Sequence, residues 1–376
     1  MRLTVPQPEL AEAAKWAARQ LPNNPINPIL NGLLLEADGD QLTLSAFDGE
    51  TCTRSHLDAD ITETGSAVLS ARLLADITGS LNKADVTITA TDTDATVETG
   101  SARFDLATLP RHDYPTLPQI PAHTGTVDGT EFAAAVARVK MAVDPAADGP
   151  FAGMSGVRLR IDGDRLELTA TDRYRIARHT LPWQPAGAAG EAIAVMPGHV
   201  VIDNAKTLAG QTVNLTIPAD GRGTAGFATG DRSVTTMLLD PDLFPHRLDR
   251  LQKDFQGTAF FDAEDLAVVI RQVATVNDGD KPIWIAFDGR HATVRARDTG
   301  SAKARVDAEL DGDLADFEAA FNSRWLLEGL AAVTGRVAME LNTPHAPALL
   351  HDPDDDTYSY VVIPIRDPHK AKPGKG

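Results

Sequence analysis

The sequence predicts an α+β protein made of three repeats of about 120 residues, each with two helices packed on antiparallel sheets. The first observation behind this prediction is a β-hairpin pattern that occurs three times. A turn glycine precedes an aspartate by nine residues in each copy, and the copies are displaced by 124 and then 126 residues. The turn glycines are Gly39, Gly163 and Gly289. A long-period repeat of this kind indicates one domain per copy.

The second observation is a helical pattern before and after every hairpin. Apolar residues recur at i, i+3, i+4 and i+7, so each helix has one apolar face. Helices are predicted at 8–20, 130–143 and 262–276 before the hairpins, and at 70–81, 197–208 and 322–333 after them. Thr130 and Asp262 are the predicted N-caps of the second and third leading helices.

Further strands are expected to complete each repeat, and proline-rich joints separate the repeats. The strands are predicted at 86–90 with 102–106, 212–217 with 233–239, and 337–341 with 358–365. The joints are 109–118 and 240–245, where proline cannot donate into a sheet ladder. The predicted domains are therefore 1–121, 125–246 and 256–366, followed by a disordered basic tail at 367–376.

Composition excludes several classes of protein. The chain has 376 residues, a net charge of −18 and a single cysteine, Cys52, so an intrachain disulfide and a cysteine-based zinc site are excluded. No apolar run approaches the ~18–20 residues that span a bilayer, and the N-terminus lacks the apolar region of a signal peptide. We expect a cytoplasmic protein. The acidic charge argues against a basic surface that wraps nucleic acid.

No pattern indicates catalysis, a metal or a cofactor. A phosphate loop, HExxH, GxSxG and a Cys/His pair are all missing from the sequence. The segment 221–226 resembles a glycine-rich cofactor loop, but no helix follows it, which favours a loop between strands. The acidic residues at 352–356 could bind a hard cation, although a solvated hairpin loop is the simpler interpretation.

Four features together resemble one family, over residues 1–366. They are the threefold helix-plus-hairpin repeat, the joint PRHDYPTLP, the loop Thr171-Asp172-Arg173-Tyr174-Arg175 and the ending YVVIPIR. In this order and at these separations they resemble the bacterial DNA polymerase III β subunit, the sliding clamp. The Arg-Tyr-Arg form of the loop is similar to that of actinobacterial members.

The resemblance implies a ring in which two chains join head to tail, with helices lining a hole for duplex DNA. The six predicted helices sum to a charge of about −1 and the remaining residues to about −17. A near-neutral lining inside an acidic shell suits a DNA-encircling ring, although long cationic side chains also simply favour helices. The DNA-facing residues implied are Lys15, Arg19, Asn24, Arg72, Arg138, Lys140 and His199. Contacts to phosphates without base readout are expected.

The resemblance also implies a pocket for short linear peptides of polymerases, the clamp loader and repair proteins. The matching positions are Met154, Thr171, Arg173, Tyr174, Arg175, Ile176, Pro245, Leu248, Val361, Ile363, Pro364, Ile365 and Arg366. The apolar members would hold Leu or Phe anchors, and Arg175 and Arg366 would donate at the rim. The alternative is a buried C-terminal strand beside an ordinary hairpin end. Pro364 favours an edge strand over a central one.

The subunit contact implied by the resemblance contains Arg103, Phe104, Leu106 and Lys303. Several positions depart from the family pattern. Asn24 stands where an arginine is frequent, Gly198-His199 replaces a basic pair, and Lys303 and Arg305 stand where acidic residues are common. These departures are compatible with a specialised second copy of the clamp.

Three functions therefore compete. The first is a non-enzymatic processivity clamp, a homodimer on duplex DNA. The second is an enzyme on the same scaffold, which lacks a visible catalytic set. The third is a decoy or resistance copy that binds clamp ligands without being the main replication clamp.

Overall fold

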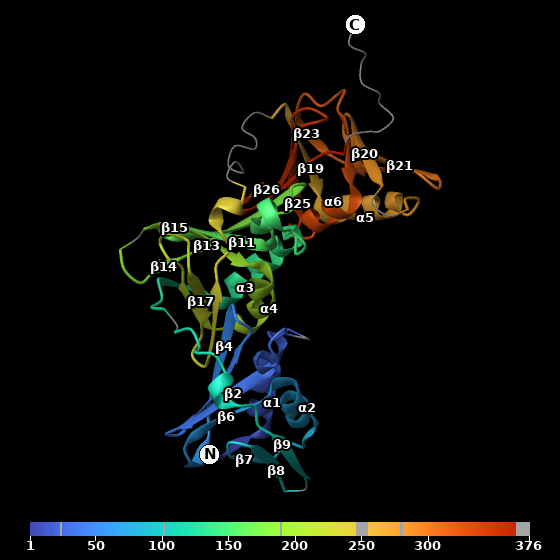
Figure 1. The fold of residues 1–376 in the computed structure, drawn as a ribbon. Helices are drawn as coiled ribbons and strands as arrows, with labels where there is room; N and C mark the ends of the chain where they lie inside the picture. The colour runs from blue at the N-terminus through green and yellow to red at the C-terminus, as the bar shows by residue number, and fades with distance from the viewer. Residues whose placement is uncertain are drawn as a thin grey trace. The chain divides into compact units, whose positions relative to one another are not determined.

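The computed structural model describes residues 1–22, 25–100, 102–119, 121–188, 190–245, 255–278 and 281–365 (Figure 1). The chain divides into two compact units. One contains Met1–Thr130 with Trp183–Leu238, and the other Glu131–Pro182 with Leu239–Gly376. The middle third of the chain is thus shared between the two units.

The first unit contains helices α1 (Gln7–Arg19), α2 (Ala71–Ser80) and α4 (Gly198–Leu208). Its strands in the first third are β1 (Arg2–Pro6), β2 (Gly32–Asp38), β3 (Gln41–Phe47), β4 (Thr51–Asp58), β5 (Asp60–Glu63), β6 (Gly65–Ser70), β7 (Asp85–Ala90), β8 (Asp94–Thr99) and β9 (Ala102–Ala107). Those in the middle third are β10 (Gly125–Asp128), β14 (Gln184–Pro185), β15 (Glu191–Pro197), β16 (Thr212–Thr216), β17 (Thr224–Ala228) and β18 (Arg232–Met237).

Two sheets organise the first unit. A five-stranded sheet has the order β5-β1-β7-β8-β9, and a nine-stranded sheet has the order β14-β10-β16-β17-β18-β4-β3-β2-β6. The nine-stranded sheet joins the first and middle thirds of the chain, because β18 and β4 pair antiparallel with Val234 opposite Thr53. A continuous ladder explains why these two thirds belong to one unit.

The second unit contains helices α3 (Gly129–Val139), α5 (Ala263–Ala274) and α6 (Ser323–Leu330). Its strands are β11 (Gly156–Asp162), β12 (Arg165–Thr171), β13 (Arg175–Pro182), β19 (Gly257–Asp262), β20 (Pro282–Asp288), β21 (His291–Arg297), β22 (Ser301–Asp307), β23 (Glu309–Gly312), β24 (Glu318–Asn322), β25 (Arg336–Leu341), β26 (Ala348–Asp352) and β27 (Asp355–Val362). Short 3₁₀ turns lie at Lys140–Ala142, Gly149–Ser155 and Pro241–Leu243.

The sheets of the second unit follow the same plan. The strands of this unit in one sheet have the order β11-β12-β13-β27-β26-β25-β19-β23, and a four-stranded sheet has the order β22-β21-β20-β24. The middle and last thirds are joined because β13 pairs with β27, with Ala177 opposite Tyr360. The apolar helix faces pack inward, and Phe132 of α3 and Ile270 of α5 are fully buried.

The structure confirms the three hairpins and the six helices. The turn glycines have nearly equal positive φ angles, 60° at Gly39 and 62° at Gly163 and Gly289, which explains the repeated glycine. Among the strands that were not predicted are β8, β17 and β26. Their polar-rich or short segments carry little alternating pattern, and β17 overlaps the glycine-rich segment 221–226.

Two local predictions were wrong. Thr130 is not an N-cap, because α3 begins at Gly129 and the Asp128 carboxylate accepts from the Thr130 amide at 2.8 Å. The C-terminal run is not an edge strand either. Strand β27 pairs on both sides, with β13 and β26, and ends at Val362, two residues before Pro364. Pro364 therefore costs the sheet no hydrogen bond. The N-cap Asp262 is confirmed, since it accepts from the amides of Glu264 and Asp265.

Within the described residues, no helix is long and apolar enough to cross a membrane.

Candidate functional site

The loop between β12 and β13 is held in one shape by its own side chains. The Asp172 carboxylate accepts from the backbone amides of Tyr174 at 3.0 Å and Arg175 at 3.1 Å. The Thr171 hydroxyl donates to the Arg175 carbonyl at 2.8 Å. Arg173 takes a φ of +77°, a conformation that a residue with a side chain adopts at a cost. The loop thereby directs Arg173 and Tyr174 outward, and both side chains are exposed.

Arg175 anchors this loop from inside the protein. Its side chain is only 7% exposed, its Nε donates to Asp172 at 2.8 Å, and its Nη1 donates to Glu328 of α6. Burial alone would lower the pKa of Arg175, but Tyr360, Glu328 and Asp172 outweigh burial and raise it. The prediction that Arg175 donates at the rim was therefore wrong, because its guanidinium is occupied by two carboxylates.

Aromatic side chains surround the exposed part of the loop. Tyr174 stacks on Trp325 of α6 with ring centroids 5.0 Å apart and planes at 21°. The Arg173 guanidinium lies 4.8 Å from the ring centroid of Phe151 and 5.9 Å from that of Tyr174. Phe151 is 43% and Tyr174 45% exposed, an unusual amount for large aromatic residues. This row of Phe151, Arg173, Tyr174 and Trp325 offers apolar faces to a partner.

The C-terminal segment lies directly against the same loop. The Ile363 amide donates to the Tyr174 carbonyl at 2.9 Å, and the Ile365 amide donates to the Ala320 carbonyl at 2.7 Å. Val361, Ile363, Pro364 and Ile365 are all half-buried. The structure thus brings together two predicted segments that are almost 190 residues apart.

The remaining predicted residues of this site form its support. Met154 and Ile176 are each 5% exposed, and Ile176 lies opposite Val361 in the β13–β27 ladder. Pro245 is half-buried at the end of the second joint. Leu248 and Arg366 lie outside the described residues. The exposed and half-buried set is the surface that we propose binds partners, and we call it the partner-binding surface: Phe151, Arg173, Tyr174, Trp325, Val361, Ile363, Pro364 and Ile365.

Sequence reasoning missed the contributions of Phe151, Trp325 and Glu328. Trp325 and Glu328 are three residues apart on α6 and face the loop together. A tryptophan beside a glutamate on an amphipathic helix could have been noted, but only the fold shows which loop they contact.

The predicted DNA-facing residues are not equivalent in the structure. Lys15, Arg19, Arg72, Lys140 and His199 are exposed on or beside their helices. Arg19 and Arg72 line one hollow of about 480 Å³ between α1 and α2, together with Asp76. Asn24 lies outside the described residues.

Arg138 is tied to the sheet instead of extending freely. Its Nη1 donates to His179 Nδ1 at 3.5 Å, and its guanidinium lies 5.8 Å from the centroid of the Tyr358 ring. A guanidinium can only donate, so Nδ1 of His179 is the acceptor and its proton is on Nε2. Arg138 is accordingly a weaker candidate for a phosphate contact than Lys140, its exposed neighbour.

The residues predicted at the subunit contact lie on the last strands of two sheets. Phe104 and Leu106 are half-exposed on β9, and Arg103 on the same strand is exposed. Lys303 is exposed on β22, the end strand of the four-stranded sheet. In the described part of the chain, neither strand has a second neighbour.

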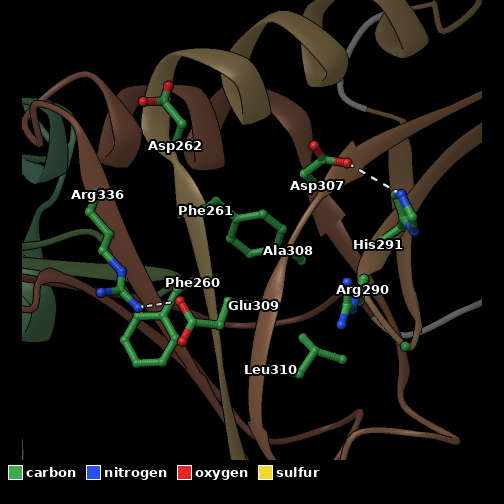
Figure 2. Close-up of a pocket in the computed structure, with 11 residues that line it drawn as sticks. Phe260, Phe261, Asp262, Arg290, His291, Asp307, Ala308, Glu309, Leu310 and Arg336 are labelled. Carbon is green, nitrogen blue, oxygen red and sulfur yellow. Dashed lines mark hydrogen bonds and ion pairs between the residues drawn. The ribbon is translucent and has the colours of Figure 1, made fainter.

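A separate hollow of about 970 Å³ lies in the last third of the chain, next to β19 and β23 (Figure 2). Four of its ionisable groups are paired, Arg336 with Glu309 at 2.6 Å and His291 with Asp307 at 3.3 Å. The Arg336 guanidinium also lies 4.3 Å from the centroid of the Phe260 ring. Among the described residues, no group of three His, Cys, Asp or Glu side chains could hold a metal ion.

The fold and the site together define a repeat-built binding protein of the sliding-clamp type. Family models of the DNA polymerase III beta subunit match almost the entire chain: the N-terminal domain at residues 1–118, the central domain at 126–246 and the C-terminal domain at 250–366. The chain belongs to the DNA polymerase III beta subunit family, the bacterial sliding clamps, which are non-catalytic processivity factors of DNA replication.

Relatives and solved structures agree. The beta sliding clamp of Streptomyces coelicolor is 39% identical over 97% of this chain and 99% of its own length. The beta sliding clamp homolog GriR of Streptomyces muensis is 32% identical over 97% of this chain and 99% of its own length. A crystal structure of the Pseudomonas aeruginosa sliding clamp bound to griselimycin is 25% identical, covers 98% of this chain and 100% of that one, and has a TM-score of 0.90.

Proposed function

We propose that this chain acts in the cytoplasm as a homodimeric ring that encircles duplex DNA and holds polymerases and other partners on it. The observation that carries the proposal is the match of all three clamp domains, in order, over residues 1–366. We also propose the domain division 1–121, 125–246 and 256–366. The two compact units do not follow it, because sheet ladders cross the boundaries between the thirds of the chain.

The end strands support ring formation. β9 and β22 each have one edge without a neighbouring strand in the described chain, and such edges readily accept a strand from another chain. Half-exposed Phe104 and Leu106 supply apolar area on β9. Because the two edges differ, the contact is heterologous, and two copies close it into a ring.

Weak contacts to phosphates suit this function. Arg19 and Arg72 lie around one hollow and Lys15 is exposed on the same helix as Arg19, while Asp76 limits the local positive charge. Such contacts hold DNA loosely and are screened by salt, so the ring slides while topology retains it.

The partner-binding surface supports recruitment of linear peptides. The bound griselimycin of the Pseudomonas aeruginosa clamp shows that a relative accepts a ligand, and the aromatic row in this chain provides apolar faces for one. A peptide with Leu or Phe anchors that buries roughly 300 Å² of apolar area gains several kcal/mol before ordering costs, at about 25 cal/mol per Å². Micromolar affinity is expected, which lets partners exchange. DNA polymerase, the clamp loader and repair proteins are the proposed partners.

A second candidate is a specialised clamp copy that binds clamp ligands without serving as the main replication clamp. The similarity to GriR and the cations Lys303 and Arg305 favour it. Both candidates share the fold and the partner-binding surface, and they differ in whether the ring supports processive synthesis.

Loading on nicked circular DNA tests the function. The full chain is loaded by its clamp loader, the DNA is isolated by gel filtration, and a restriction enzyme then linearises half of the sample. We expect the protein to stay on circles and to leave linear DNA, because retention is topological. Equal retention on both forms would contradict a sliding ring. Retention on circles without stimulated polymerase synthesis would favour the specialised copy.

A further inference from the structure

The internal sheet junctions predict how two copies meet. In the first unit, β18 of the middle third pairs with β4 of the first third, and in the second unit, β27 of the last third pairs with β13 of the middle third. The corresponding strands left over are β9 of the first third and β22 of the last third, the ends of the five-stranded and four-stranded sheets. Pairing of these two end strands between two copies would form a third junction of the same kind.

The register of this third junction follows from the other two. Val234 of β18, Tyr360 of β27 and Phe104 of β9 hold equivalent positions in their sheets. Each lies opposite an apolar residue of the preceding strand, namely Phe227, Leu350 and Val97. Thr53 of β4, Ala177 of β13 and Ala302 of β22 likewise hold equivalent positions. Each lies opposite an alanine of the preceding strand, namely Ala46, Ala170 and Ala296. Val234 lies opposite Thr53, and Tyr360 opposite Ala177. Phe104 should therefore lie opposite the partner's Ala302, and Ala102 opposite the partner's Ala304.

The outer face of β8 and β9 is acidic. Exposed Arg103 donates to Glu98 at 2.6 Å and to Asp105 at 3.1 Å, so these three groups carry one net negative charge. The hydrogen bond from Arg103 lowers the pKa of Asp105 further below its ordinary value, so this carboxylate is ionised at neutral pH. Asp94 adds a further acid on the same face, opposite Ala107.

The outer face of β21 and β22 is basic. Arg295 lies opposite Lys303, Thr293 opposite Arg305, and Arg297 opposite Ser301, so four cations share the face. Glu318 pairs with Arg295 at 2.7 Å and Asp288 with Arg305 at 3.5 Å. His291 and Asp307, which pair with each other, lie at its far end. Within the described chain, Arg297 and Lys303 are left without a carboxylate partner.

We propose that, in the β9–β22 contact of this ring, Glu98 and Asp105 accept the partner's Arg297 and Lys303. Arg103 then acts as an internal cation that positions the two carboxylates, although it lies opposite the partner's Lys303 in this register. The proposal rests on the ring dimer of the proposed function and adds the charge of each side of the contact. The first domain contributes an acidic edge, and the third domain contributes a basic edge. A clamp whose third-domain edge is acidic would be rejected.

Sedimentation of the full chain tests the polarity through the dimer dissociation constant. Glu98→Gln with Asp105→Asn should raise this constant about tenfold, because Arg103 then faces the partner's cations without neutralisation. Arg103→Gln is the matched control and should leave the dimer as tight or tighter. Added salt should weaken the wild-type dimer. The opposite pair of results, a weaker dimer with Arg103→Gln and a tighter one with the acid variants, would overturn the proposal while leaving the ring intact.

Cysteine cross-linking tests the register. Opposite residues on antiparallel strands have Cα atoms about 4.5–5.5 Å apart, within the range of a disulfide. Ala102→Cys with Ala304→Cys should give a covalent dimer on mild oxidation, whereas Ala102→Cys with Ala302→Cys should not, because diagonal residues are about 7–8 Å apart. Buried Cys52 does not compete. Cross-linking of only the second pair would overturn the register, and a wild-type monomer at micromolar concentration would overturn the ring itself.

Discussion

At the scale of single residues, Arg175 decides the shape of the partner-binding surface without belonging to it. Its buried guanidinium holds Asp172 of the loop and Glu328 of α6 together. Glu328 also accepts from Arg324 at 3.0 Å, and Tyr360 donates to the Trp325 carbonyl at 2.9 Å. The loop that exposes Tyr174 is thereby connected to the helix that carries Trp325.

Arg175→Met should therefore release the loop. Two partly buried carboxylates lose their shared cation, which we expect to cost about 3 kcal/mol of local stability. Hydrogen exchange of the Ile363 amide, which donates to the Tyr174 carbonyl, measures this opening. Arg173→Met is the matched control. Arg173 is exposed, and within the described residues its guanidinium lies against the Phe151 and Tyr174 rings, contacts worth under about 1 kcal/mol. Equal effects of the two variants would contradict the anchoring role.

At the scale of elements, the β13–β27 junction contains a buried neutral histidine. His179 is 8% exposed and lies opposite Tyr358 in the ladder. Burial, reinforced by Arg138, lowers its pKa from 6.5 to about 4. The unfolded chain therefore binds a proton on His179 between pH 6.5 and 4 that the folded junction does not bind, so stability falls as the pH drops through this window.

The pH dependence can be isolated with a variant. Between pH 7 and pH 5, His179 should cost the second unit about 2 kcal/mol of unfolding free energy. His179→Gln should remove that slope, whereas His345→Gln, at an exposed histidine of the same unit, should leave it unchanged. Urea unfolding at several pH values measures both. An unchanged slope in His179→Gln would show that other groups control the junction.

At the scale of the whole molecule, sheet ladders rather than linkers join the repeats. The proline-rich joints connect consecutive repeats along the chain, while the hydrogen-bonded β18–β4 and β13–β27 strand pairs hold the repeats together. Tyr114 in the first joint is itself buried, and its hydroxyl donates toward the Gly32 and Ser45 carbonyls. The joint is thus packed against the first third of the chain.

Disrupting the proposed β9–β22 contact between two copies should abolish the dimer without changing the affinity for a partner peptide. Phe104→Asp with Leu106→Asp would bury unpaired charge at the subunit contact, so sedimentation should show a folded monomer at micromolar concentration. Calorimetry with a clamp-binding peptide should give an affinity within about twofold of wild type, since the partner-binding surface shares no residues with β9. Lys15→Asp, a charge change on an exposed helix position, should leave the dimer intact. Loss of peptide binding in the monomer would contradict this separation.

The sequence by itself determined the local elements. Alternation, helical spacing and turn glycines predicted three hairpins and six helices, because these features depend on neighbours within a few residues along the chain. Asp262 and Asn322 cap their helices through amides two and three residues away. The repeat spacing then implied equivalent domains, and the loop and ending together implied a clamp.

The tertiary structure alone decided which strands pair between repeats and which charged groups are buried. Nothing local to Arg175 indicates that its partner is Glu328, 153 residues away, and nothing local to Arg138 indicates that it contacts Tyr358 instead of extending freely. Pro364 favoured an edge strand because its own missing N–H is a local fact, whereas the end of β27 at Val362 is set by its two neighbours. Contacts of this kind form when segments that are distant in the sequence exclude water from a shared interface. The periodicity of a single segment therefore does not predict them.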